Sequence, residues 1–239
     1  MAFKDGDFLE IEYSAWNTVD NSLLASTDEK RTKDAGIYNS NVRYGPMLVV
    51  LGANAIVKGL ERELKGMSIG EEKSFTLRPE DAFGKRREEL VRVMPMSEFR
   101  THDINPQPGM RVNIDNVVAT VRSVSSGRVV IDANHPDAGK EIKYTTKVVR
   151  ELIDNIDKAK ALANTYDLRP TNTILKDGVL ELFFDSNVKK NADYFVNKAG
   201  ALAAIFTYLK DIKKANVHEE YSPESVKEET KAEAQDKPA

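Results

Sequence analysis

The chain of 239 residues contains no cysteine, one tryptophan and three histidines. Disulfide bonds, thiolate metal sites and cysteine nucleophiles are therefore excluded. The histidines, His102, His135 and His218, are far apart in the sequence, and no H-E-x-x-H pattern occurs. No strand-to-helix turn of the nucleophile-elbow type is indicated either. We expect neither a metal nor a cofactor, and a reaction that uses no nucleophile.

Neither an excess of one charge nor a long apolar run is present. The 35 Lys and Arg face 38 Asp and Glu, a formal net charge of −3, which gives no electrostatic reason to expect a nucleic-acid partner. No run approaches the ~18 apolar residues of a membrane span. The start, MAFKDGDFLEIEY, is charged where a signal peptide has its apolar core. We expect a soluble, cytoplasmic protein with no nucleic-acid or membrane partner.

The N-terminal part has the alternating patterns of strands. Residues 7–14 alternate apolar and acidic side chains, and residues 16–27 are predicted to form a hairpin with its turn at Asp20-Asn21. The polar stretch 28–46 is predicted to be a surface excursion. MLVVLG (47–52) and EKSFTL (72–77) are further strand candidates.

A short helix is predicted between these two strands. From Gly59 onward, Leu60, Leu64 and Met67 lie on one helical face, and Gly66 closes the segment. RPEDAFG, residues 78–84, has a proline and a glycine where a short helical turn begins and ends.

Between residues 86 and 136 the sequence pattern changes to several short strand candidates, namely ELVRVMPM, MRVNI, NVVATVRSV and RVVIDA. A unit of about 50 residues is too short to bury a generous core by itself. His135-Pro136 indicates an extended step in the returning chain, and we interpret His135 as a turn-capping residue. KYTTKVV follows as a strand.

The C-terminal part is predicted to be an α/β unit. Residues 152–165 have helical periodicity, and a hairpin is centred on Lys176-Asp177-Gly178. A long helix is predicted over 191–215, with lysines near its end, as the helix dipole favours, and NVHEEY is a closing strand. The apolar stripe of this helix is Phe195, Ala199, Leu202, Phe206 and Leu209. Residues 222–239 are predicted to be a disordered tail.

The order of Tyr13, YGPMLVVLG, IVKGLERELKGMSIGEE and RPEDAFG resembles the FKBP-type peptidyl-prolyl cis/trans isomerases. The break after AFG, the insert beginning ELVRVMP and the return through NHPDAGKE resemble the SlyD-like branch, which carries an insert-in-flap chaperone domain at this point. The resemblance covers about residues 5–150. Beyond it, the chain resembles the C-terminal extension of long archaeal-type members.

The resemblance implies an α+β fold, with an FKBP-like antiparallel half-barrel around a short helix, an inserted small β-rich domain and a C-terminal α/β domain. The implied division is 1–85 plus 137–151 for the isomerase domain, 86–136 for the insert, 152–221 for the C-terminal domain and 222–239 for the tail.

The resemblance also implies a site and an activity. The residues carried over to the prolyl pocket and its second-strand pair are Tyr13, Leu24, Ala25, Met47, Val49, Ile56, Val57, Leu60, Phe83 and Tyr144. Leu60 is expected at the floor, and the N–H of Val57 is expected to donate to the substrate carbonyl next to proline. Rotation of an X-Pro bond passes a barrier of ~18–20 kcal/mol. An apolar cavity lowers it by disfavouring the charge-separated ground state.

Two departures from the family pattern concern this pocket. The usual Phe-Asp pair is Leu24-Ala25, and the tyrosine of the usual A-Y-G is Phe83. Both changes remove hydrogen-bonding groups, so we expect weak binding of macrolide drugs and slow catalysis. The leading prediction is an isomerase and folding chaperone acting on unfolded or proline-containing polypeptides. The alternative is a non-catalytic holdase or adaptor that keeps the fold. A metal-delivery protein lacks ligands here.

The insert is expected to bind unfolded chains through exposed apolar side chains, because flexible methionines suit promiscuous binding. The residues expected to do so are Leu90, Val91, Val93, Met94, Met96 and Phe99. The long C-terminal helix has apolar residues on more than one side. A homodimer through this domain and packing within the chain are both consistent with that breadth.

Overall fold

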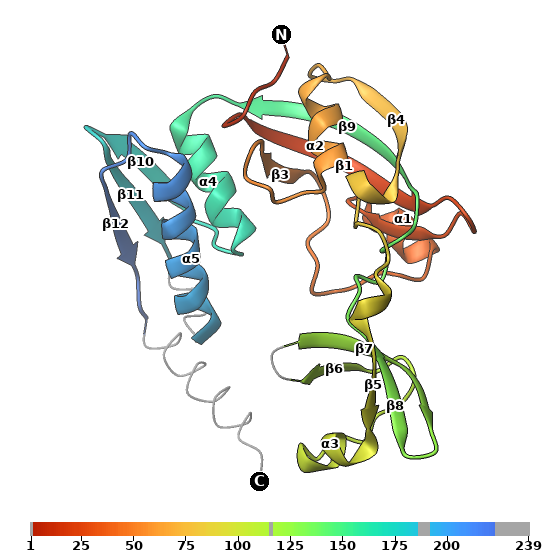
Figure 1. The fold of residues 1–239 in the computed structure, drawn as a ribbon. Coiled ribbons are helices and arrows are strands. Elements are labelled where there is room, and N and C mark those ends of the chain that lie inside the picture. The colour runs from red at the N-terminus through yellow and green to blue at the C-terminus, as the bar shows by residue number, and fades with distance from the viewer. Residues whose placement is uncertain (1, 115–116, 186–191, 223–239) are drawn as a thin grey trace.

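The computed structural model describes residues 2–114, 117–185 and 192–222 (Figure 1). A five-stranded sheet with wholly antiparallel pairing dominates the N-terminal part, in the order β2-β1-β9-β4, with β3 also paired to β1. Its strands are β1 (Phe8–Asn17), β2 (Leu23–Ser26), β3 (Met47–Val50), β4 (Glu72–Leu77) and β9 (Ile142–Leu152). Strand β9 returns from the far side of the insert to pair with β1 over its whole length, so the insert does not interrupt this sheet.

Helix α2 (Lys58–Lys65) crosses the inner face of the sheet. Leu60 and Leu64 are buried against Leu9 and Ile11, because residues four apart share one helical face. The helix ends at Gly66, and a 3₁₀ turn, η1 (Pro79–Asp81), lies beside it. The expected strands and short helix of this part are thus present.

The insert contains a second sheet, in the order β5-β8-β7-β6. Its elements are η2 (Glu88–Leu90), β5 (Val91–Pro95), α3 (Met96–Thr101), β6 (Arg111–Ile114), β7 (Val117–Ser125) and β8 (Arg128–Asp132). Phe99 of α3 is fully buried against Val112, Val121 and Val129. The insert therefore has a small core of its own, which one helix closes.

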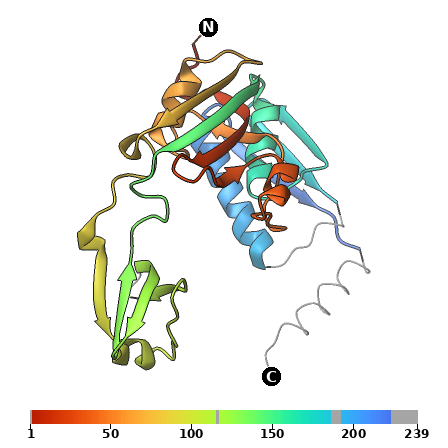
Figure 2. The same cartoon turned by 90° about the vertical axis from the view of Figure 1, so that its right-hand side faces the viewer.

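Two chain segments, 84–90 and 133–141, connect the insert to the isomerase sheet (Figure 2). They are bonded to each other. The side-chain amide of Asn134 accepts from the Arg87 N–H and donates to the Arg87 carbonyl, both at 2.9 Å. The Gly139 N–H donates to the Gly84 carbonyl at 2.8 Å. The hinge is thus a ladder of hydrogen bonds rather than a loose linker.

The C-terminal part is a three-stranded sheet, β10-β11-β12, covered by two helices. Its elements are α4 (Asn155–Thr165), β10 (Asn172–Lys176), β11 (Val179–Phe184), α5 (Ala192–Tyr208) and β12 (Lys214–Glu219). Strands β10 and β11 pair antiparallel, whereas β11 and β12 pair parallel. The positive φ angles of Asp177 and Gly178 confirm the predicted hairpin turn.

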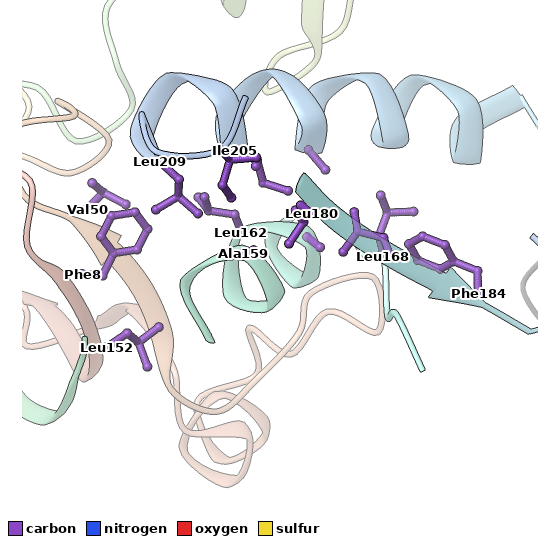
Figure 3. Close-up of a cluster of buried hydrophobic side chains, with 14 of the residues drawn as sticks. Phe8, Val50, Leu152, Ala159, Leu162, Leu168, Leu180, Phe184, Ile205 and Leu209 are labelled. Carbon is purple, nitrogen blue, oxygen red and sulfur yellow. The ribbon is translucent and has the colours of Figure 1, made fainter. Parts of the chain in front are cut away.

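This part shares a core with the isomerase sheet. Phe8, Val50 and Leu152, from β1, β3 and β9, belong to the same buried cluster as Leu162 and Ile205 of α4 and α5 (Figure 3). Along these strands, successive side chains point to opposite faces. One face therefore packs on α2, and the other packs on the C-terminal helices.

Three expectations about local structure are wrong, and one helix was not predicted. The polar stretch 28–46 is largely exposed, as expected of a surface excursion, but it contains a helix, α1 (Glu29–Asp34), which Asp28 caps by accepting from the Arg31 N–H. The strand expected through Met96 ends at Pro95, where α3 begins. The long helix ends at Tyr208, so the following lysines lie outside its last turn.

The third correction concerns the buried stripe of α5. Tyr194, Ala201, Ile205 and Leu209 are buried, whereas Phe195 and Phe206 are half-exposed, at 50% and 40%. The buried face is thus rotated by about one residue from the predicted stripe. The predicted tail lies outside the described residues, apart from Ser222. Among the helices that the structure describes, none has the length and apolarity needed to cross a membrane.

Candidate active site

A cavity of about 330 Å³ opens between the sheet and the N-terminus of α2. Seven of the ten residues expected at the site line it: Tyr13, Met47, Ile56, Val57, Leu60, Phe83 and Tyr144. Ala55 also lines it and was not predicted. We call this cavity the prolyl pocket. The lining is assembled from β1, β3, β9, α2, the segment just before α2 and the turn after η1.

Three expected residues lie outside the lining. Val49 is on the same face of β3 as Met47, but it is 1% exposed and packs in the core two residues deeper. Leu24 packs on the edge of that core. Ala25 is paired with Ala15 in the β1–β2 ladder. The prediction that Val49 lines the pocket is wrong, because alternation gives the face of a strand but not the depth along it.

The floor and one wall of the pocket are aromatic and apolar. Leu60 and Tyr144 are 3% and 4% exposed. The Tyr144 ring lies 6.2 Å from the Tyr13 ring and 6.0 Å from that of Phe75, centroid to centroid. Burial raises the pKa of Tyr13, and burial with the nearby Tyr13 raises the pKa of Tyr144 to about 12. Both phenols are therefore neutral at physiological pH.

The polar groups at the pocket are few and have free hydrogen-bonding capacity. Within the described part of the chain, the hydroxyls of Tyr13 and Tyr144 have no hydrogen-bond partner. The Val57 N–H, at the N-cap position of α2, likewise donates to no group in that part. The Val57 carbonyl, in contrast, accepts from the Glu61 N–H. The pocket thus offers donors to a substrate within apolar walls.

A larger cavity, of about 510 Å³, lies beside α1 and shares Tyr13 with the prolyl pocket. Glu12, Glu29, Arg31 and Lys147 are among its lining residues. An apolar proline ring would displace water from these charged side chains without replacing its hydrogen bonds, which is unfavourable. The smaller prolyl pocket is therefore the better candidate site for proline.

The expected binding residues of the insert are divided by the structure. Val93 is 63% exposed. Leu90, Val91, Met94 and Met96 are half-buried, and the last two pack against the core of the insert. Phe99 is 0% exposed, so its assignment to a binding surface is wrong: it is the central side chain of that core.

Three further apolar side chains of the insert are exposed, although the sequence did not predict this. Met110, Val117 and Val118 are 40%, 44% and 51% exposed. The strand candidates MRVNI and NVVATVRSV contained them, but the pattern did not tell which face of the small sheet α3 covers. The sequence signal that could have found one of them is the adjacent apolar pair Val117-Val118, because successive strand side chains point to opposite faces and α3 covers one face of this sheet.

The structure places the dispersed histidines in separate surroundings. In the part of the chain that the structure describes, no three His, Cys, Asp or Glu side chains are grouped as metal ligands. Nδ1 of His135 accepts from the Asp137 N–H at 3.1 Å, which confirms the turn-capping interpretation. The His135 ring is also stacked on Phe83, which the sequence did not indicate.

Comparisons with known proteins decide the family. Residues 1–100 match the model of the FKBP-type peptidyl-prolyl cis-trans isomerases. The chain is 34% identical over 145 residues to the short-type peptidyl-prolyl cis-trans isomerase of Methanocaldococcus jannaschii, covering 91% of that protein and 61% of this chain. This chain belongs to the FKBP-type peptidyl-prolyl cis-trans isomerases. It is accordingly a peptidyl-prolyl cis/trans isomerase with an α+β FKBP fold.

Within the family, the chain is SlyD-like. It is 31% identical over 136 residues to SlyD of Vibrio cholerae, covering 67% of that protein and 55% of this chain. SlyD of Escherichia coli is 29% identical over 123 residues, which cover 62% of that protein and 50% of this chain. Residues 92–137 match the model described as the IF domain of FKBP26. Family membership favours an enzyme over the non-catalytic holdase.

Proposed function

We propose that this isomerase binds a proline side chain in the prolyl pocket and there rotates the peptide bond before it. The observation that carries the proposal is an apolar cavity of about 330 Å³ with the Val57 N–H at its wall, which donates to no group among the described residues. The planar amide is the more charge-separated state, so an apolar cavity raises its free energy relative to the twisted state. A hydrogen bond to a neighbouring carbonyl holds the chain in that geometry.

The test is exchange NMR on a proline-containing tetrapeptide. With the enzyme at catalytic concentration, the cis and trans signals exchange faster than in buffer. The same sample, with labelled enzyme, locates the peptide: the amide signals of Val57 and Tyr144 shift on titration. Fast exchange with shifts confined to another surface would place the reaction elsewhere.

We propose further that the insert binds unfolded chains through its exposed apolar side chains. Val93, Met110, Val117 and Val118 support this, because each presents an apolar side chain to solvent from this unit of about 50 residues. The two activities fit each other, since a loosely held chain presents its prolines to the nearby pocket at a raised local concentration. The proposed division is an isomerase domain, 1–85 plus 137–151, with the insert 86–136 as its chaperone module.

A double variant, Val93→Ser with Val118→Ser, separates these activities. It is expected to slow the catalysed refolding of a proline-limited protein by about tenfold, while tetrapeptide isomerisation is unchanged. Arg92→Ser, at an exposed neighbouring position of β5, is the matched control. Equal refolding rates in the double variant and the control would contradict the role of the insert.

The homodimer through the C-terminal domain, 152–221, remains our proposal. The exposed face of α5 includes Phe195, Ala199, Ala203 and Phe206. Lys198, the one charged residue between Tyr194 and Leu209, is paired with Glu219. Light scattering of the full chain is expected to give the dimer mass, and Ala199→Glu is expected to give the monomer. A monomer in both cases would refute it.

A further inference from the structure

A third cavity, of about 360 Å³, lies at the hinge of the insert. We call it the hinge pocket. Both crossing segments contribute to its lining, which includes Leu90 from the outgoing segment and Ala133, His135 and Ala138 from the returning one. These two segments join the isomerase sheet to the insert (Figure 2). None of these four residues lines the prolyl pocket.

The hinge pocket and the prolyl pocket have one lining side chain in common. Phe83 lines both cavities. Its ring is stacked face to face on His135, with centroids 4.2 Å apart and planes 1° from parallel. His135 is itself held by the Asp137 N–H at Nδ1. Phe83, stacked on His135, is therefore a side chain common to the two linings.

The lining of the hinge pocket selects apolar side chains. Leu90, Ala133, Ala138 and the two stacked rings supply hydrocarbon. The side-chain amide of Asn134, which also lines the cavity, is already used in the hinge. It accepts from the Arg87 N–H and donates to the Arg87 carbonyl. Lys85, at the rim, is ion-paired with Glu80. Arg87 also belongs to the lining, and its Nε lies 3.9 Å from a Glu89 carboxylate oxygen. The hydrocarbon of the lining favours an apolar side chain over a polar one.

We propose that the hinge pocket is a second subsite for the substrate polypeptide, which takes an aliphatic or aromatic side chain two or three residues from the proline. The inference rests on the proposed prolyl pocket. The two cavities share the Phe83 side chain, so they are neighbours, and an extended chain advances about 3.3 Å per residue. A chain with its proline in the prolyl pocket therefore reaches the hinge pocket within a few residues. The enzyme therefore prefers apolar residues at a distance from proline.

Pentapeptides and hexapeptides with one proline in an alanine background test this directly. Alanine, leucine or phenylalanine is placed two or three residues before or after the proline, and kcat/KM is measured by exchange NMR. We expect leucine and phenylalanine at one of these positions to raise kcat/KM about tenfold over alanine, since a half-buried leucine contributes about that factor. Ala138→Phe, which fills the cavity, is expected to reduce this ratio to between one and two.

Glu88→Phe is the matched control, because it adds the same ring at an exposed hinge position outside the lining. It is expected to keep the tenfold ratio. Equal kcat/KM for alanine, leucine and phenylalanine at all four positions of the wild-type series would overturn the hinge subsite and leave the prolyl pocket standing. An undiminished ratio in Ala138→Phe would also overturn it. Turnover of no peptide in the series would overturn both proposals.

Discussion

Gly59 of α2 lies against Leu77 of β4 so closely that a β-carbon on the glycine would stand 2.6 Å from the Leu77 Cδ2. The same carbon would lie 2.9 Å from the Asp81 carbonyl oxygen. Both distances are far below van der Waals contact, so α2 is set on the sheet at a depth that only glycine permits. Because Leu60, the next residue, forms the floor of the prolyl pocket, this contact also fixes the depth of the pocket.

Gly59→Ala is therefore expected to lower the free energy of unfolding by about 1–3 kcal/mol, since the helix must move outward. Thermal or urea unfolding measures the change. Gly66→Ala is the control, because a β-carbon there would lie 3.6 Å from its nearest neighbour, the Glu63 carbonyl oxygen. Equal losses of stability in the two variants would contradict the close approach at Gly59.

The donor role of Val57 is tested by Val57→Pro. Its φ of −63° suits proline, and within the described residues its N–H makes no hydrogen bond, so the substitution removes the donor with little loss inside the protein. We expect kcat/KM for a tetrapeptide to fall about tenfold, the effect of one hydrogen bond of about 1.4 kcal/mol. Val57→Ala keeps the N–H and is the control. Melting curves of both variants check the fold, and equal activities would exclude the donor role.

The missing hydrogen-bonding groups of the pocket are tested by restoring them. Ala25 lies opposite Ala15 and diagonal to Tyr13 on the same face of the sheet, so Ala25→Asp brings a carboxylate within reach of the Tyr13 hydroxyl. Together with Phe83→Tyr, it is expected to tighten the binding of a macrolide inhibitor of the family about tenfold. Titration calorimetry measures the affinity. An unchanged Kd would show that these departures do not limit drug binding.

Asp132 makes the stability of the insert pH-dependent. Burial of this carboxylate would raise its pKa, but hydrogen bonds from Asn134, Arg122 and Arg86 outweigh burial and hold the pKa well below its ordinary range. A depressed carboxyl pKa contributes stability that is fully present above the unfolded value of about 3.9 and is lost as the pH falls below it. Arg86 belongs to the hinge, so the same carboxylate orders the crossing segment.

Asp132→Asn is expected to cost about 2 kcal/mol at pH 7. The difference in unfolding free energy between wild type and variant should shrink as the pH falls from 4 towards 2. The other carboxylates titrate in both proteins, so their contributions to this difference cancel. Chemical denaturation followed at several pH values gives it. A difference that stays constant from pH 7 to pH 2 would mean that Asp132 is not the titrating group.

The strands and the motif order of the isomerase domain were predictable because they depend on local patterns. Alternation placed β1, β4 and β9, and Gly66 marked the end of α2. The seven correct lining residues came from the resemblance, which carries tertiary information that periodicity does not. Ala55 escaped prediction because a small side chain at a cavity rim has no pattern of its own.

The burial of individual side chains in the insert and in α5 was not predictable, because it depends on which face of each element a neighbouring element covers. Phe99 and Val93 are equally apolar in sequence, yet α3 buries the first, and the second lies on the open side of β5. The stripe of α5 was misplaced because this helix has apolar residues all round, so its period does not define one face. Phe83 and His135 meet only because the hinge returns the chain 52 positions later.

The central claim is that a dry cavity speeds rotation about the X-Pro bond, and one pair of variants tests it most directly. Ala55→Asp places a carboxylate at the exposed rim of the prolyl pocket, and Asn54→Asp places the same charge one residue away, outside the lining. Exchange NMR on a proline tetrapeptide should show at least a tenfold lower kcat/KM for Ala55→Asp than for Asn54→Asp. Equal rates in the two variants would contradict the claim.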